Sequence, residues 1–331
     1  MKITDRQFLS VPTFTCHAST IAFYKDYPVF AWFGGSREGL PDSSIYVQYK
    51  DKIKSLGKNI KKAHWNPILF NIGEELFLAY KVGEFCDRWT TFLINITDIE
   101  NIDDLNTVPK QLIPAGLNFA VKTKPIMNKH KDFIYCGSSV ETREDWSSYI
   151  EIYTYENGKF IFKERSRPLT VEKQQYEYKH SFYGQVKAIT QGIIQPSLWR
   201  DKNGVYNAFF RSSKGLGKIY HSYNNMDSVS TYWLDPLPTK LDNPNSGIDT
   251  VYFNDRLFLV NNPNDTYRYP LVIHELNDKF EIINEIVIRE KVDKTDCSPE
   301  LSYPYMIEHN GKLHLTYTYG RKKIEYGVIE I

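Results

Sequence analysis

Two strands and the charged loop between them occupy one stretch of the chain, Phe30-Ala-Trp-Phe-Gly-Gly-Ser-Arg37-Glu-Gly-Leu-Pro-Asp42-Ser-Ser-Ile-Tyr-Val-Gln48. Val29–Phe33 is an apolar run of strand length, and Ser44–Gln48 alternates polar and apolar residues as a half-buried strand does. We interpret the glycine pair between them as a tight turn, because glycine adopts backbone angles that other residues resist. The sequence therefore predicts a hairpin with Arg37 and Asp42 at its tip, a place where strands often position binding and catalytic side chains.

A similar pattern recurs along the chain with a period of roughly 50 residues. Short segments stand just before a predicted strand, and four of them contain X-Pro: Asn66–Leu69, Lys124–Met127, Gln195–Leu198 and Tyr303–Met306. His17–Thr20 and Ser246–Asp249 occupy the equivalent places in the other two units. The apolar strands that follow are predicted over 29–33, 76–81, 132–136, 205–211, 256–261 and 312–318. A third strand is then predicted over 44–48, 91–95, 149–155, 218–223, 270–276 and 323–329.

Six such units account for nearly all 331 residues and predict an all-β fold, a six-bladed β-propeller that forms a single domain over residues 1–331. The alternative is a pair of β-sandwiches. In a propeller the starts of the innermost strands line one end of the channel, so the recurring segments would bring polar residues to a single site. Residues 163–190 are the least strand-like part of the chain, and we interpret them as a long insertion over the channel mouth.

Composition excludes several classes of protein. The chain has 41 Lys and Arg against 40 Asp and Glu, and this balance argues against a nucleic-acid binder that works through bulk charge. No apolar run is long enough for a membrane span, and the first residues lack the apolar core of a signal peptide. We expect a cytoplasmic protein, with peripheral or periplasmic association as the alternative. Cys16, Cys86, Cys136 and Cys297 are scattered without metal-ligand spacing and are expected to be reduced, buried thiols.

Arginine and tyrosine stand where inner strands begin or end. Arg211 ends an apolar strand, Arg268 follows the loop that begins with Asn261-Asn262-Pro263, and Tyr303 lies in a recurring X-Pro segment. Several arginines that converge on a channel would form a receptor for a carboxylate, because guanidinium binds carboxylate through two parallel hydrogen bonds. A tyrosine beside an acidic or amide group can act as a nucleophile, and an aspartate across the site can protonate a leaving sugar oxygen.

On these residues the chain resembles the exo-sialidase clan, retaining glycosidases on a six-bladed propeller. Arg37 and Asp42 have the spacing of that clan's arginine and acid/base aspartate, and Arg211 stands in Phe-Phe-Arg-Ser like the second arginine of its triad. The resemblance implies that Arg268 is the third arginine and Tyr303 the nucleophile. Gln195 stands where the clan has the glutamate that assists the tyrosine, and His17 stands where it has the first arginine of the triad.

A bacterial sialidase-like branch of the clan is more similar still. Its motifs match this chain at Cys16–Thr20, Trp32–Gly39, Trp65–Pro67, Tyr80–Gly83, Asn243–Asp249, Ser302–Pro304 and Tyr317–Arg321. The Asp-boxes of the clan are eroded, and Ser222–Trp233 is their nearest remnant.

Several more residues are candidates for the site. Lys81, Lys124 and Glu141 interrupt apolar strands, so each lines the channel or caps a blade edge, and Asn66 opens an X-Pro segment. Asn245 and Asp249 either shape a turn through side-chain hydrogen bonds, which we favour slightly for both, or contact a ligand. The aromatic pairs Phe209-Phe210 and Tyr317/Tyr319 are interpreted as blade packing rather than as sugar platforms.

The resemblance implies a retaining exo-glycosidase that removes a terminal acidic sugar from a glycan or lipopolysaccharide: sialic acid, another nonulosonic acid, or 3-deoxy-octulosonic acid (Kdo). Arg37, Arg211, Arg268 and His17 would hold the sugar carboxylate, with Lys81, Lys124, Glu141, Asn66 and Asp249 as further substrate contacts. Tyr303 would attack the anomeric carbon, Gln195 or Glu300 would orient it, and Asp42 would act as acid and then as base. The scheme uses no cofactor and no metal.

Two other functions remain open on the sequence. The first is a sugar-acid-binding propeller that has lost hydrolysis and works with a partner subunit, because His17 and Gln195 replace an arginine and a glutamate. The second is a lyase that acts on uronic-acid polysaccharides, with His17 and Tyr303 as base and acid.

Overall fold

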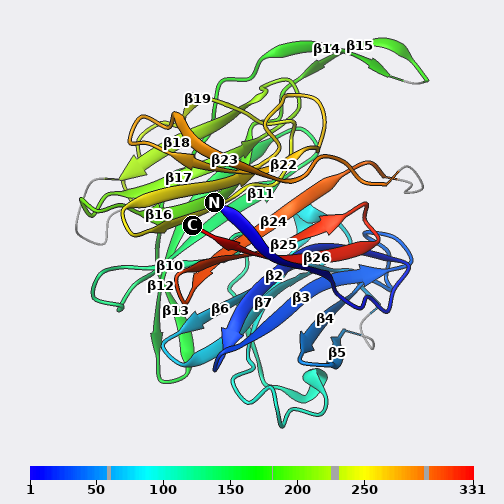
Figure 1. The fold of residues 1–331 in the computed structure, drawn as a ribbon, viewed down its shortest axis with the longest axis vertical. Coiled ribbons are helices and arrows are strands. Elements are labelled where there is room, and N and C mark those ends of the chain that lie inside the picture. Colours follow the sequence, from blue (N-terminus) through cyan, green and yellow to red (C-terminus); the bar gives the residue numbers. More distant parts are fainter. Residues whose placement is uncertain (58–60, 181, 225–230, 294–297) are drawn as a thin grey trace.

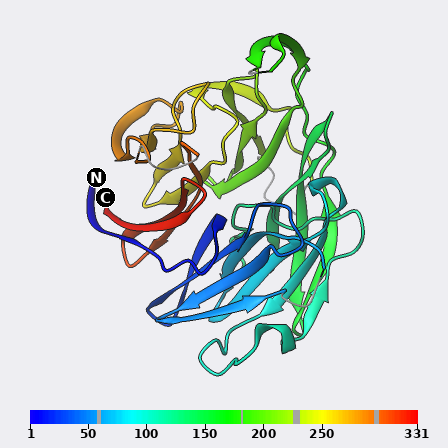
Figure 2. The same ribbon diagram turned by 90° about the vertical axis from the view of Figure 1, so that its right-hand side faces the viewer.

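The fold was examined in a computed structural model, which describes residues 1–57, 61–180, 182–224, 231–293 and 298–331. Six antiparallel sheets of four strands each surround a common axis (Figures 1 and 2). The protein is therefore a six-bladed β-propeller, as the repeat predicts. No helix in the described ranges is long and apolar enough to cross a membrane.

The first five blades each begin at the propeller axis and proceed outward in chain order. Blade one consists of β2 (Thr15–Tyr24), β3 (Tyr27–Gly35), β4 (Ser44–Tyr49) and β5 (Lys52–Leu56). Blade two consists of β6 (His64–Ile72), β7 (Glu75–Val82), β8 (Thr90–Asn95) and β9 (Lys110–Leu112). Blade three consists of β10 (Ile126–Met127), β11 (Ile134–Glu141), β12 (Trp146–Glu156) and β13 (Lys159–Arg165). Blade four consists of β16 (Ile193–Arg200), β17 (Tyr206–Ser212), β18 (Lys218–Asn224) and β19 (Leu237–Asp242). Blade five consists of β20 (Asp249–Phe253), β21 (Arg256–Asn261), β22 (Leu271–Leu276) and β23 (Ile282–Arg289). Short 3-10 turns, η1 (Cys86–Arg88) and η2 (Leu105–Thr107), flank β8.

The sixth blade joins the two ends of the chain. It contains β24 (Leu301–His309), β25 (Lys312–Tyr319) and β26 (Lys323–Glu330), and its outer strand is β1 (Lys2–Phe8), which pairs antiparallel with β26. The termini consequently lie side by side in both ribbon views (Figures 1 and 2). Because the first and last segments share one sheet, hydrogen bonds close the ring.

The core lies between neighbouring blades. Inner strands such as β16 and β17 are buried almost throughout, whereas outer strands such as β13 and β23 are largely exposed. Phenylalanines of the second and third blades pack edge to face or tilted, for example Phe70 against Phe119 at 5.7 Å between ring centroids. Phe209, Phe210, Tyr317 and Tyr319 are all buried, which confirms their interpretation as blade packing.

Buried Glu151 and buried Lys81 stabilise the junction between blades two and three, called here the seam, through hydrogen bonds to residues 118–120. The Glu151 carboxylate accepts hydrogen bonds from the backbone N–H groups of Asn118 and Phe119 at 3.1 and 2.8 Å. Ser138 Oγ and Tyr153 OH donate to the same carboxylate at 2.7 and 2.6 Å. Lys81 Nζ donates to the carbonyls of Asn118 and Ala120, and burial lowers the pKa of Lys81 to about 7. Lys81 thus contacts backbone of the seam.

A repeated β-bulge shapes the start of the inner strands. The strand register shifts within β2, β6, β16 and β24, and the residue at each shift has a left-handed backbone: Ala18 (φ 51°), Asn66 (φ 40°), Gln195 (φ 54°) and Tyr303 (φ 51°). Lys122 (φ 76°) has the same conformation just before β10. Non-glycine residues adopt this conformation at a cost of about 1–3 kcal/mol, and bulges redirect side chains. The X-Pro segments of β6, β16 and β24 therefore lie within their strands rather than before them.

Two further predictions are corrected. Gly34 and Gly35 lie inside β3, where their role is space rather than a turn: a Cβ on Gly34 would stand 2.4 Å from Thr13 Oγ1. Residues 163–190 are not free of strands, because β13 continues to Arg165 and β14 (Gln175–His180) pairs with β15 (Gly184–Ile189). The alternation of Tyr176, Tyr178 and His180 with exposed polar residues is a strand pattern that the interpretation as an insertion overlooked.

The cysteine prediction holds for two of the described residues. Cys16 and Cys136 are buried free thiols, but Cys86 is exposed at η1, because the loop after β7 runs over the surface. Cys297 lies outside the described residues, as does part of the Ser222–Trp233 remnant.

Candidate active site

Tyr303 lies at the centre of a polar cluster at one end of the channel. Its bulge in β24 places the phenol oxygen 3.1 Å from Arg211 Nη1, which donates a hydrogen bond to it. The His17 imidazole packs against the tyrosine ring at 4.3 Å between centroids. Gly247 lies on another side, where a Cβ would stand in ordinary contact with the Tyr303 Cα at 3.5 Å. A cation and an aromatic ring from two other blades thus fix the position of the phenol.

Arg211 is held in one orientation by amides. It ends β17 next to the bulge of β16, and its Nη1 also donates to Gln195 Oε1 at 3.0 Å. Its Nε and Nη2 both donate to Asn245 Oδ1, at 3.0 and 2.8 Å. The fork of Arg211 is 5% exposed and has no carboxylate partner among the described residues. It therefore keeps its positive charge available to an anion.

Arg268 and Arg321 share one carboxylate. Glu300 Oε2 lies 3.3 Å from Arg268 Nη1, and Glu300 Oε1 lies 2.9 Å from Arg321 Nε. Ser302 Oγ also donates to Glu300 at 2.8 Å. Burial and the neighbouring Arg211 lower the pKa of Arg268. Glu300 therefore holds both guanidinium groups in place.

His17 is enclosed and neutral. Its side chain is 3% exposed, and neither ring nitrogen has a hydrogen-bond partner among the described residues. Burial, and then the charges of Arg321, Arg268, Lys122 and Arg211, lower the pKa of His17 well below its ordinary value. A histidine at this position therefore supplies polar nitrogens to the site but no further positive charge.

Acidification is expected to destabilise the protein in part through His17. The unfolded chain takes up the proton near pH 6.5, whereas the folded protein resists it, so stability present above that pH is lost as the pH falls. His17→Gln should flatten the fall in the free energy of unfolding between about pH 7 and 5, by up to about 1.4 kcal/mol per pH unit, as measured by urea unfolding. His130→Gln, at an exposed turn, is the control. An unchanged slope in His17→Gln would contradict this assignment.

The loop between β3 and β4 lies at the rim of the cluster. Arg37 and Asp42 are both exposed there, and Asp42 Oδ2 accepts a hydrogen bond from the Ser36 backbone N–H at 2.8 Å. The loop reaches the cluster through Glu38, whose carboxylate pairs with Arg321 Nη1. The loop thus brings Arg37 and Asp42 to the rim of the cluster, while their neighbour Glu38 contacts it directly.

A second layer of charge lies deeper in the channel. Lys124 Nζ is 2.8 Å from both oxygens of Asp249, and this carboxylate also accepts from Ser197 Oγ and the Met306 backbone N–H. Lys122 Nζ donates to the carbonyl of Pro304 at 3.1 Å, and burial lowers its pKa to about 7. Asp249 therefore ties three blades together, and its fully buried carboxylate serves internal bonds.

Glu141 lies beside the amide that orients Arg211. Gln195 Nε2 donates to Glu141 Oε1 at 3.3 Å, and Ser139 Oγ lies 3.4 Å from the same oxygen. Burial raises the pKa of Glu141, although Arg211 acts in the opposite direction. The exposed Cys86 contacts the Glu141 carbonyl at 3.4 Å. A carboxyl whose pKa is raised by burial beside charged groups is typical of sites of proton transfer.

The structure thus brings Tyr303, Arg211, Arg268, Gln195, Glu300, His17 and Glu141 together. The contacts of the described residues do not join Lys81 or Asn66 to this cluster; Asn66 is buried in the bulge of β6. Sequence reasoning missed Arg321, Lys122 and the role of Asn245. Asn245 binds Arg211, and it is Asn243 that holds the turn through both its side-chain atoms.

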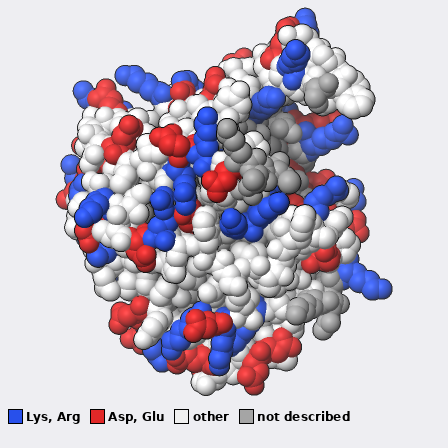
Figure 3. All heavy atoms as spheres, turned by 45° about the vertical axis from the view of Figure 1, so that its right-hand side comes forward, with Lys and Arg blue, Asp and Glu red and all other residues white. Residues whose placement is uncertain are grey.

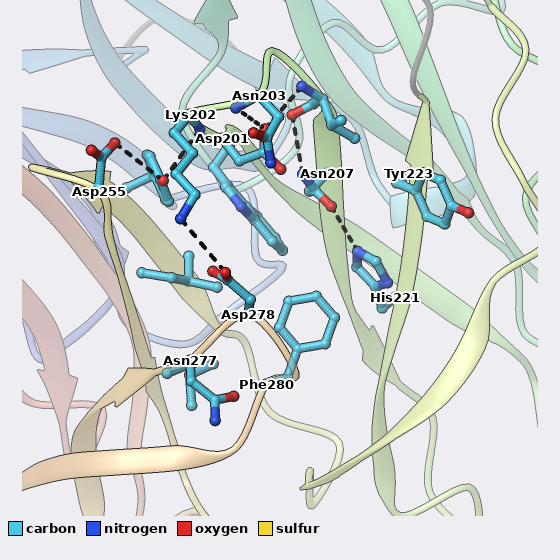
Figure 4. Close-up of a pocket in the computed structure, with 15 residues that line it drawn as sticks. Asp201, Lys202, Asn203, Asn207, His221, Tyr223, Asp255, Asn277, Asp278 and Phe280 are labelled. Atoms are coloured by element: carbon cyan, nitrogen blue, oxygen red, sulfur yellow. Dashed lines mark hydrogen bonds and ion pairs between the residues drawn. The ribbon is translucent and has the colours of Figure 1, made fainter.

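A separate cavity of 340 Å³ lies where the hairpin turns of blades four and five meet (Figure 4). Asp201, Lys202 and Asn203 of the β16–β17 turn face Asp278 and Phe280 across it. Asp201 Oδ1 caps its own turn, and Lys202 Nζ lies 3.6 Å from Asp278. The β16–β17 turn stands at the opposite end of these strands from Gln195 and Arg211, so this cavity is distinct from the cluster.

Several solved structures have a similar fold. The chain resembles a protein of unknown function from Dyadobacter fermentans, with a TM-score of 0.71, 13% identity, and coverage of 100% of this chain and 99% of the other. It resembles Trypanosoma rangeli sialidase in complex with the inhibitor DANA at TM-score 0.64 and 9% identity, covering 96% of this chain and 55% of the sialidase. A subtype N10 neuraminidase-like protein of A/little yellow-shouldered bat/Guatemala matches at TM-score 0.55 and 7% identity, over 100% and 98% of the two chains.

This chain spans about half the length of the trypanosomal sialidase chains that it matches. A search of curated proteins finds no match. The family model described as a BNR repeat-like domain matches residues 29–315, most of the chain. The protein belongs to this BNR repeat-like family, and its six-bladed propeller fold is similar to that of the sialidase and the neuraminidase-like protein.

Proposed function

We propose that the protein is a retaining exo-glycosidase that removes a terminal 2-keto-3-deoxy sugar acid, with Tyr303 as nucleophile. The observation that carries the proposal is the convergence of Arg211, Arg268 and Arg321 around the Tyr303 phenol. The Trypanosoma rangeli sialidases to which the fold is similar include one in complex with sialic acid, a sugar of this class. A carboxylate beside the anomeric carbon is what distinguishes such sugars from neutral ones.

Guanidinium groups would hold that carboxylate. Arginine binds carboxylate bidentately, and burial strengthens such charge-assisted bonds. Since His17 is neutral, Arg321 supplies the positive charge that histidine does not. Arg37 would contact the substrate from the rim loop.

Tyr303 would attack the anomeric carbon. A guanidinium that donates to the phenol oxygen stabilises negative charge on that oxygen as its proton leaves. Gln195 and Glu300 are positioning residues in this scheme, because Gln195 orients Arg211 while Glu300 orients Arg268 and Arg321. Glu141, one hydrogen bond beyond Gln195, is the nearest acid with a raised pKa.

Asp42 would act as acid and then as base. In the first step the Tyr303 phenol gives its proton to the Glu141 carboxylate through an intervening water, and its oxygen bonds to the anomeric carbon. The glycosidic C–O bond breaks, and the leaving oxygen takes the proton of Asp42. In the second step Asp42 removes a proton from water, the water oxygen bonds to the anomeric carbon, and the Tyr303 oxygen leaves and takes its proton back from Glu141. The configuration at the anomeric carbon is retained.

The direct test is release of free sugar acid, followed by mass detection, from α-ketosides of N-acetylneuraminic acid, other nonulosonic acids and Kdo. Release from one of these is expected, and it identifies the substrate class. Release from none of them, with the protein folded, would overturn the proposal.

A second candidate is binding without hydrolysis. His17 and Gln195 are uncharged where the sialidase clan has an arginine and a glutamate, and this difference favours binding without hydrolysis. It predicts saturable binding of a free sugar acid, lost in Arg211→Ala, with no product from any ketoside. Calorimetric titration with N-acetylneuraminic acid and Kdo, run beside the release assay, separates the two functions.

Arg321→Leu is expected to weaken sugar-acid binding by about 10- to 100-fold, because a hydrogen bond to a charged group contributes about 1.5–3 kcal/mol. Titration of the free acid measures this loss. Arg321→Lys should recover part of it, since it restores the charge without the fork. The matched control is Lys323→Ala, which removes an exposed cation two residues away. Equal losses in both variants would mean a general charge effect rather than a contact.

A further inference from the structure

The β14–β15 hairpin projects from the propeller as an arm, defined here as Gln175–His180 and Gly184–Ile189 with Phe182 and Tyr183 of its tip (Figure 1). It leaves the ring between blades three and four and overhangs the surface (Figure 3). Its two strands pair only with each other. A two-stranded sheet with so little support is marginally stable in water, so its side chains are expected to have a function beyond packing.

The base of the arm is tied to the strand that carries Arg211. Ser213 Oγ accepts hydrogen bonds from the backbone N–H groups of Gln191 and Gly192, at 3.0 and 3.2 Å. The Trp146 backbone N–H donates to the Gln191 carbonyl at 3.0 Å, and the Trp146 ring lies 5.7 Å from the Arg211 guanidinium. The arm therefore begins at the edge of the candidate active site.

The two faces of the arm differ in chemistry. Tyr176, Tyr178 and His180 alternate along β14 on one half-buried face, while Glu177 and Lys179 are exposed on the other. This alternation follows the two-residue period of a strand.

The aromatic face forms a continuous series of rings. Centroids of Tyr176 and Tyr178 lie 5.7 Å apart with nearly parallel planes, those of Tyr178 and His180 lie 6.3 Å apart, and those of His180 and Tyr183 lie 4.9 Å apart. The series starts over the loop that follows Arg211, where Gly215 alone leaves room, since a Cβ there would stand 2.5 Å from the Tyr176 ring. Lys214 Nζ lies 3.9 Å from the Tyr178 ring centroid. The series thus runs outward from the site to the tip.

We infer that this aromatic face is a subsite for the neutral sugars next to the acidic one, an inference that rests on the proposed function. Tyrosine rings offer flat apolar surfaces with a polar edge, which suit the faces of pyranose rings. Because the rings follow one another along the strand, a ligand that contacts several of them must be extended, as a run of linked sugars is. The acidic sugar would occupy the arginine cluster while the rest of the chain lies along Tyr178, His180 and Tyr183.

The first experiment measures binding of neutral glycans without any chemistry. Lacto-N-tetraose and a neutral lipopolysaccharide core oligosaccharide are titrated into the full chain, which distinguishes a glycan from a lipopolysaccharide source. One of them is expected to bind. Tyr178→Ala with Tyr183→Ala should weaken that binding by about 10-fold or more. The control is Glu177→Ala with Lys179→Ala on the opposite face of the same strand, which should bind as the native protein does.

The second experiment uses hydrolysis. For the double tyrosine variant, the KM for an acidic oligosaccharide should rise about 10-fold relative to the KM for an aryl ketoside that lacks those sugars. An unchanged ratio together with no binding of either neutral glycan by the native protein would overturn the subsite and leave the glycosidase intact. Absence of sugar-acid release with neutral-glycan binding retained would remove the glycosidase and leave the arm as a glycan-binding face. Concentration-dependent dimers that the double variant abolishes would instead assign the arm to a second copy of the chain, against the proposal.

Discussion

Tyr303→Phe is expected to reduce sugar-acid release by on the order of 10³-fold or more while the free acid still binds within a few-fold of the native affinity. The substitution removes only the oxygen that would bond to the anomeric carbon. The ring, its contact with His17 and the three guanidinium groups stay in place. Single-turnover assays of release, beside titration of the free acid, measure the two quantities separately.

Tyr305→Phe is the matched control for this variant. Tyr305 lies two residues further along β24, is fully buried, and donates its hydroxyl hydrogen bond to the Leu69 carbonyl at 2.7 Å. Its loss should cost about 1 kcal/mol of stability and leave turnover near native. Native turnover in Tyr303→Phe would remove the tyrosine as nucleophile, whatever the control shows.

Glu151→Ala is expected to destabilise the protein by about 3–5 kcal/mol. The variant leaves two backbone N–H groups, Ser138 Oγ and Tyr153 OH without their acceptor inside the seam between blades two and three. It also removes the negative charge that favours the protonated form of the buried Lys81. Urea unfolding near neutral pH measures the loss.

Two comparisons separate this network from a general effect of removing an acid. Glu151→Gln keeps one oxygen acceptor and should cost less than the alanine variant. Glu156→Ala, at the exposed end of the same strand, removes a carboxylate that pairs with Lys163 in solvent and should leave stability close to that of the native protein. Similar losses in Glu151→Ala and Glu156→Ala would contradict the role of the seam.

The propeller was predictable because each blade repeats a local pattern. Apolar runs such as 256–261 and turn residues such as Asp201–Gly204 fix strands and hairpins through contacts close in sequence, and six repeats leave few other arrangements. The prediction of a turn at the glycine pair of β3 was wrong because the contact that decides its role is distant in sequence. Its requirement for small side chains comes from Thr13, which sequence periodicity does not place beside it.

Residues of the candidate site were predictable where their positions within a single blade indicate them. Arg211, Gln195 and Tyr303 follow from their places in inner strands and from the resemblance to sialidases. Arg321 did not follow, although it ends a motif visible in the sequence, because its partner Glu38 is 283 positions away. Lys122 was missed because Lys124-Pro125 two residues later carries the visible pattern, while the left-handed backbone falls on Lys122.

By itself the sequence determined the strands, their repeat and therefore the six-bladed ring, since hydrogen-bonded hairpins and alternating burial are local properties of the chain. Only the tertiary structure decided which charges meet: Glu300 between Arg268 and Arg321, the neutral His17 among cations, and the arm over the loop after Arg211. Closing the ring brings together residues from different blades, and burial there sets which groups keep their charge. No pattern along one strand encodes those distances.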